Sequence, residues 1–152
     1  MLTRTFEILL VDDDADDCMF FEEALRSISK RSKLTIVRDG EQLITLLNTV
    51  KILPEILFLD LNMPLKNGFE CLEEIKANKK LSALPVVIMS TSFDPAKIAN
   101  LHKKGAVLYI RKPSNFSELE KVIQYALTFA TKKHLVQPAI ELFVITGIKD
   151  GK

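Results

Sequence analysis

The chain has 152 residues, of which 21 are basic and 20 are acidic, so its formal net charge is only +1. This length fits one domain with one core, and the balanced charge excludes a general electrostatic attraction to nucleic acid or to anionic membranes. No apolar stretch approaches the roughly 18 residues that a membrane span needs. Glu7 and Asp12 interrupt the first apolar run, so no secretory signal is predicted and no membrane partner is expected.

Short apolar runs alternate with amphipathic stretches along most of the chain. The runs predict five strands, at residues 6–11, 34–37, 56–59, 86–89 and 107–110. Apolar residues at helical spacing predict five helices, at residues 16–29, 42–50 and 69–77, from Pro95 after an Asp94 cap, and up to Lys132 after a Ser114 cap. Continuous apolar strands with helices on both faces imply an α/β fold with a doubly wound, five-stranded parallel sheet.

The C-terminal tail departs from this alternation. Residues 140–145 read Ile-Glu-Leu-Phe-Val-Ile and predict an additional strand, set apart by Pro138 and Gly147. An exposed apolar strand aggregates unless it is paired. We therefore expect a domain over residues 1–133 and an extension over residues 134–152, which forms an edge strand or a dimer contact.

The two cysteines, Cys18 and Cys71, lie in helix-like segments without the spacing of metal ligands. Two isolated cysteines do not make a disulfide framework, so we interpret them as free, buried thiols in a reducing compartment. This pattern predicts a cytoplasmic protein. The two histidines, His102 and His134, are expected to be solvated.

Polar residues stand where four of the predicted strands end. The first strand delivers Asp12 and Asp13, and the third delivers Asp60. The fourth strand delivers Ser90 and the fifth Lys112. In open α/β sheets, ligands bind beyond the carboxyl ends of the strands. In the flavodoxin-like order 2-1-3-4-5 these strands are neighbours, so the five side chains are expected to converge.

The chemistry of this set points to phosphoryl transfer. Three carboxylates in one small site repel each other, and a Mg²⁺ ion, which prefers oxygen ligands, removes that penalty. A carboxylate can attack phosphorus to give an aspartyl-phosphate. A lysine and a hydroxyl can then neutralise charge on the phosphoryl oxygens. Asp14, Asp16 and Asp17 are expected to do no more than favour the start of the first helix.

Four ordered motifs carry a resemblance to a known family. They are V-D-D-D at 11–14, L-D-L-N-M-P-L-K-N-G-F at 59–69, M-S-T at 89–91 and K-P at 112–113. Together they resemble the receiver domain of response regulators, over about residues 5 to 131. The resemblance implies that Asp60 accepts the phosphoryl group. It also implies a Mg²⁺ site formed by the carboxylates of Asp13 and Asp60, the backbone carbonyl of Asn62, and a metal-bound water held by Asp12.

The resemblance further implies a switch. Ser90 would be the switch hydroxyl, with Thr91 as the alternative if the register shifts by one residue. Tyr109 would be the aromatic side chain that rotates, and Lys112 would pair with the phosphoryl group. A cis bond between Lys112 and Pro113 is also expected from the resemblance, although few X–Pro bonds are cis.

The implied function is a signalling switch rather than an enzyme with an external substrate, since such a domain catalyses only its own phosphorylation and dephosphorylation. A sensor histidine kinase would donate the phosphoryl group. The output would be a downstream protein partner, or onward transfer to a histidine phosphotransfer protein. The Thr91-Ser92 pair and the single-domain layout also resemble receivers that serve phytochrome-type kinases.

Two other functions use similar residues. A haloacid dehalogenase-type phosphohydrolase also has a strand-end aspartate, Mg²⁺, a hydroxyl and a lysine. That family carries a second aspartate two residues after its nucleophile, where this chain has Asn62, and its nucleophile follows the first strand rather than the third. A receiver that never takes phosphate is the other alternative, although every expected group is present.

Overall fold

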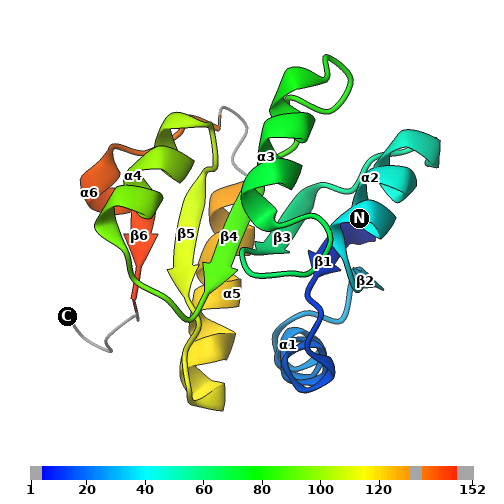
Figure 1. Cartoon of the computed structure of the whole chain (residues 1–152). Coiled ribbons are helices and arrows are strands. Elements are labelled where there is room, and N and C mark those ends of the chain that lie inside the picture. The colour runs from blue at the N-terminus through cyan, green and yellow to red at the C-terminus, as the bar shows by residue number, and fades with distance from the viewer. Residues whose placement is uncertain (1–4, 131–134, 147–152) are drawn as a thin grey trace.

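The computed structural model describes residues 5–130 and 135–146. Its strands are β1 (Phe6–Val11), β2 (Ser32–Val37), β3 (Ile56–Asp60), β4 (Val86–Ser90), β5 (Leu108–Arg111) and β6 (Val144–Ile145). Its helices are α1 (Ala15–Ile28), α2 (Gly40–Thr49), α3 (Gly68–Ala77), α4 (Pro95–Lys103), α5 (Phe116–Ala130) and α6 (Ile140–Phe143). All strand pairs are parallel, and the order β2-β1-β3-β4-β5-β6 confirms the predicted doubly wound sheet (Figure 1).

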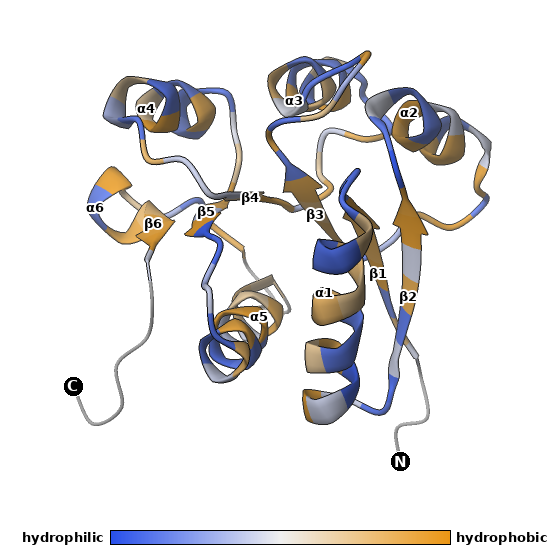
Figure 2. Cartoon of the chain, turned by 60° about the horizontal axis from the view of Figure 1, so that its bottom comes forward, coloured by the Kyte–Doolittle hydropathy of each residue, from blue (hydrophilic) through white to orange (hydrophobic). Residues whose placement is uncertain are grey.

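Helices cover both faces of the sheet, with α2, α3 and α4 on one side and α1 and α5 on the other (Figure 2). Along β1, Leu9 and Val11 join the first of these two cores, and Ile8 and Leu10 join the second. Successive side chains of a strand point to opposite faces. Both faces are buried here, which is why the strands read as continuous apolar runs.

Several predicted details are confirmed and others are wrong. Asp94 caps α4, because its side chain accepts hydrogen bonds from two backbone N–H groups of the first turn. The cap of α5 is Asn115 rather than Ser114, since the Asn115 side chain accepts from the Glu118 N–H at 2.8 Å. Adjacent polar residues fit the same sequence pattern, and only the backbone geometry selects between them. The predicted end of this helix at Lys132 lies outside the described residues.

The two cysteines are free and buried, as predicted. Burial raises the pKa of each thiol to about 11, so both stay protonated near neutral pH. None of the helices in the described part of the chain combines the length and apolar composition needed to span a bilayer.

The tail adds a strand to the sheet, but a shorter one than the sequence predicts. Val144 and Ile145 pair with Tyr109 and Ile110 of β5, which places β6 at the sheet edge. The four residues before β6 form the helical turn α6 beside α4 instead of a strand (Figure 1). β6 pairs with only two of the four residues of β5. The turn also places Phe143 in the core, where it is 0% exposed.

Contacts from α4 hold the tail in place. The His102 ring nitrogen Nε2 lies 2.8 Å from the Pro138 carbonyl oxygen, and the His102 ring packs edge-on against Phe143. The Gln137 amide donates to the His102 and Ala106 carbonyl oxygens, both at 2.6 Å. The prediction that His102 is merely solvated is therefore wrong, whereas His134 lies outside the described residues.

Phe143→Ala should lower the free energy of unfolding by about 3 kcal/mol, because truncation of a buried Phe leaves a cavity. Leu142→Ala is the matched control, since Leu142 is 67% exposed. Urea unfolding of both variants checks the prediction. If both variants were as stable as the wild type, the tail would not contribute to the core in solution.

Candidate functional site: an acidic cluster at the carboxyl edge of the sheet

Three carboxylates meet at the ends of β1 and β3. Asp12 and Asp13 directly follow β1, and Asp60 is the last residue of β3. One carboxylate oxygen of each lies within 4.8 Å of the others. β1 and β3 are parallel neighbours that pair up to Val11 and Leu59, so both strands end at the same edge of the sheet. The structure therefore brings together the three aspartates that the sequence marks.

The turn after β1 is held by contacts that the sequence analysis missed. The Arg38 guanidinium donates to the backbone carbonyls of Asp12 at 3.1 Å and Asp13 at 2.8 Å. The Asp12 carboxylate in turn accepts from the Asp14 N–H at 3.0 Å. The sequence could have indicated this contact, because Arg38 directly follows β2 and β2 is the neighbour of β1 in the sheet. These bonds fix the backbone that carries the two adjacent carboxylates.

Lys112, which follows β5, supplies the positive charge of the site. Its ammonium lies 3.0 Å from Asp12, 2.9 Å from Asp17 and 3.6 Å from Asp60. Burial lowers the pKa of Lys112, but the hydrogen bond to Asp17 and the charge of Asp60 outweigh it and hold that pKa above its usual value. The peptide bond between Lys112 and Pro113 is trans, as are all peptide bonds among the described residues. The cis expectation is wrong, and trans is the ordinary state of an X–Pro bond.

Asp60 is 6% exposed, and burial raises its pKa from 3.8 to about 7. The Lys112 charge and a hydrogen bond from the Asn62 backbone lower this pKa, while the charges of Asp12 and Asp13 raise it. One ammonium is thus insufficient to keep the whole cluster ionised near neutral pH. A divalent cation held within this cluster would favour the ionised, nucleophilic form of Asp60. The donor set, made only of oxygens, fits Mg²⁺.

Hydrogen bonds link Ser90, Ser92 and Tyr109 beside the acidic cluster. Ser90, the last residue of β4, is fully buried, and its hydroxyl lies 2.9 Å from the Ser92 hydroxyl. The Tyr109 hydroxyl donates to the Ser92 carbonyl at 2.6 Å, with the ring 1% exposed. The Ser90 carbonyl accepts from the Lys112 N–H at 2.8 Å. Thr91 is exposed, so the buried hydroxyl at the end of β4 is that of Ser90.

The loop from β3 to α3 runs close against Asp60. Leu65 has φ 69°, and the Lys66 N–H donates to the Pro64 carbonyl across it, which makes a tight three-residue turn. Gly68 then returns the chain, and its N–H donates to the Leu61 carbonyl at 3.0 Å. A Cβ at position 68 would lie 2.7 Å from the Asp60 carbonyl oxygen. The glycine of the D-x-x-M-P-x-x-x-G motif is therefore needed for this close approach.

Gly68→Ala should destabilise the fold by about 2 kcal/mol, because the added methyl group overlaps the backbone of Asp60 and Leu61. Lys79→Ala, at an exposed position after α3, is a suitable control. Thermal unfolding of both variants provides the comparison. A Gly68→Ala variant as stable as the control would mean that the loop yields easily at this point.

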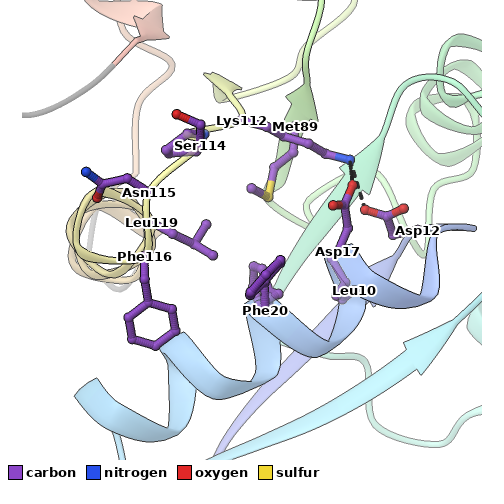
Figure 3. Close-up of a pocket in the computed structure, with 12 residues that line it drawn as sticks. Leu10, Asp12, Asp17, Phe20, Met89, Lys112, Ser114, Asn115, Phe116 and Leu119 are labelled. Carbon is purple, nitrogen blue, oxygen red and sulfur yellow. Dashed lines mark hydrogen bonds and ion pairs between the residues drawn. The ribbon is translucent and has the colours of Figure 1, made fainter.

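A cavity of about 230 Å³ opens next to Lys112, between α1 and α5 (Figure 3). Its walls are mainly apolar and include Phe20, Met89, Phe116 and Leu119. Lys112, Asp12 and Asp17 form its polar end, and dashed lines in Figure 3 join the ammonium to both carboxylates. The acidic cluster thus adjoins an apolar surface.

Comparisons with known proteins agree with this geometry. The response regulator Rcp1 of Synechocystis is 33% identical over 124 residues, which cover 77% of this chain and 83% of Rcp1. The crystal structure of the phosphorylated cyanobacterial phytochrome response regulator RcpA superposes with a TM-score of 0.78 at 30% identity, covering 89% of this chain and 99% of RcpA. The Mn²⁺-bound form of Rcp1 gives 0.75 at 31% identity, covering 88% and 99%. The model of the response regulator receiver domain matches residues 8–124, and the chain therefore belongs to this family.

Proposed function

We propose that the protein is a phosphoacceptor signalling switch of a two-component system. Asp60 takes a phosphoryl group from a sensor histidine kinase in a Mg²⁺-dependent reaction. The observation that carries the proposal is the position of Asp60, a buried strand-end carboxylate between two further aspartates and one lysine. The general role of the family, phosphoryl transfer from a kinase to an aspartate, supports it.

The side chains of the site have separate roles in this reaction. One Asp60 carboxylate oxygen attacks phosphorus, the phosphorus–nitrogen bond of the donor phosphohistidine breaks, and the leaving imidazole takes up a proton. The Lys112 ammonium and the Ser90 hydroxyl donate to phosphoryl oxygens as charge develops there. Asp13, Asp60 and the Asn62 carbonyl would hold the cation, with Asp12 binding one of its waters. When bound, Mg²⁺ neutralises the carboxylates and polarises the phosphoryl group.

Phosphorylation would then reach the surface through β4 and β5. A phosphoryl group on Asp60 offers new acceptors to Ser90, whose hydroxyl now bonds with Ser92. If Ser90 turns to the phosphoryl oxygens, the Ser92 segment that holds the Tyr109 hydroxyl is released. We propose that the populations of the Ser90 and Tyr109 conformers shift in this way.

Phosphoryl transfer to Asp60 also implies the partners of the protein. The kinase is the donor, and the output is a downstream protein or a histidine phosphotransfer protein. The similar proteins Rcp1 and RcpA are both response regulators, and RcpA is named as a phytochrome response regulator. This similarity supports a donor kinase of the phytochrome type. We also propose a homodimer contact at β6, because β6 is the last strand of the sheet. The two free thiols support a reducing cytoplasm.

Incubation with acetyl phosphate and Mg²⁺ tests the proposal. The expected product is one hydroxylamine-sensitive phosphoryl group per chain, located by peptide mapping to the segment that contains Asp60. EDTA should prevent its formation. Steady turnover of a generic phosphate ester would support a phosphohydrolase instead, and absence of any aspartyl-phosphate would support a receiver that never takes phosphate. Transfer from the labelled protein to a histidine phosphotransfer protein would identify a relay shuttle.

A further inference from the structure

Lys112 has a third carboxylate partner that lies outside the acidic cluster. Its ammonium is 2.9 Å from Asp17, closer than it is to Asp60 at 3.6 Å. Asp17 belongs to the first turn of α1 rather than to a strand end, and it approaches the lysine from the side of the α1–α5 cavity (Figure 3). The ammonium is thus shared between the cluster and a carboxylate on a helix.

Local structure fixes the position of Asp17. Asp14 caps α1, and its side chain accepts from the Asp17 N–H at 3.0 Å. The neighbouring Cys18 thiol donates to the Asp12 carbonyl at 3.4 Å and ties the same turn to the end of β1. Asp17 is therefore placed by a capped and tethered turn, although its side chain is 40% exposed.

We propose that Asp17 is a positioning residue that competes with the phosphoryl group on Asp60 for the Lys112 ammonium. This inference rests on the proposed phosphoryl transfer to Asp60. In the structure, the bond to Asp17 holds the ammonium on the α1 side of the cluster. A phosphoryl group on Asp60 must draw the ammonium away from that bond.

Removal of the Asp17 charge should change two affinities in opposite directions, that for a phosphoryl group and that for Mg²⁺. Without the Asp17 charge, the ammonium keeps its bond to Asp12 but loses its partner on α1, so it can turn further towards Asp60, which favours binding of a phosphoryl group there. The same movement brings positive charge closer to the carboxylates that would hold Mg²⁺, and it removes one nearby anion. Loss of Asp17 should therefore strengthen binding of a phosphoryl mimic and weaken binding of Mg²⁺ alone.

The test compares Asp17→Asn with Asp16→Asn, a matched control at an exposed position in the same first turn. Calorimetry measures the affinity for Mg²⁺ alone, and the affinity for beryllofluoride at saturating Mg²⁺. For Asp17→Asn we expect Mg²⁺ binding to weaken by about threefold and beryllofluoride binding to tighten by about threefold, within the range of half-exposed ion pairs. Asp17→Glu should restore both affinities towards the wild-type values, because it keeps the charge.

The outcomes separate this inference from the function on which it rests. If Asp17→Asn matches Asp16→Asn in both affinities, or weakens both, the competition does not exist and Asp17 has a structural role only. Thermal unfolding identifies a general loss of structure, and Asp17→Ser repeats the test with a smaller neutral side chain. If the wild type itself does not bind beryllofluoride with Mg²⁺, the proposed phosphoryl transfer is wrong, and the inference falls with it.

Discussion

Asp60→Asn should abolish labelling of the protein by acetyl phosphate and Mg²⁺. The amide lacks the ionised oxygen that attacks phosphorus, and the other aspartates of the site are poor substitutes. Asp12 is paired with Lys112, and Asp13 is exposed to water, where a carboxylate is a weaker nucleophile. The measurement is phosphoryl incorporation by intact mass at equal protein concentration. Asp16→Asn serves as the control and should label like the wild type.

Stoichiometric labelling of Asp60→Asn would remove Asp60 as the phosphoacceptor. Peptide mapping would then show which residue carries the phosphoryl group. Labelling of another aspartate in the cluster would mean that the site is correct but that the nucleophile is a different residue. Labelling outside the cluster would contradict the site itself.

The same substitution should stabilise the metal-free protein at about pH 8. In the folded state the pKa of Asp60 is raised to about 7, whereas its ordinary value is 3.8. Between these values the folded state binds more protons than the unfolded state, so this group lowers stability as the pH rises. Asn cannot ionise, so Asp60→Asn should be more stable than the wild type at about pH 8, by a few kcal/mol at roughly 1.4 kcal/mol per pKa unit.

Urea unfolding in EDTA at about pH 4 and about pH 8 measures this difference. The gain should nearly vanish at the lower pH, because the wild-type carboxyl group is then protonated in the folded state. Adding Mg²⁺ at the higher pH should raise the stability of the wild type far more than that of the variant. A gain independent of pH would mean that burial of charge at position 60 is not its source.

The sequence predicts the strand-end aspartates because their position follows from a simple rule. A charged residue directly after a continuous apolar strand lies at the carboxyl edge of a parallel sheet. Asp12 and Asp60 obey this rule, Lys112 follows its strand one residue later, and the sheet order brings these strands together. Gly68 belongs to a motif that carries the family resemblance, and the structure supplies its reason, because a Cβ there would overlap the backbone of Asp60.

Contacts between segments that lie far apart in the sequence are harder to predict. Asp17 looks like an ordinary acid in the first turn of a helix, and only the approach of α1 to the end of β5 reveals its pair with Lys112. Arg38 reaches two carbonyl groups whose positions depend on the β1–β2 register. The sequence predicts a strand where α6 forms, because a short apolar run fits a strand and a buried helical turn equally well.

The central claim is that the carboxylates of Asp13 and Asp60 bind one divalent ion beside the acceptor oxygen. A crystal structure of the protein with Mg²⁺ and beryllofluoride tests it most directly. We expect one ion in contact with both carboxylates and the Asn62 carbonyl, and beryllofluoride bonded to Asp60 within reach of Lys112 and Ser90. An ion bound elsewhere, or an Asp60 side chain that carries no beryllofluoride, would contradict the account.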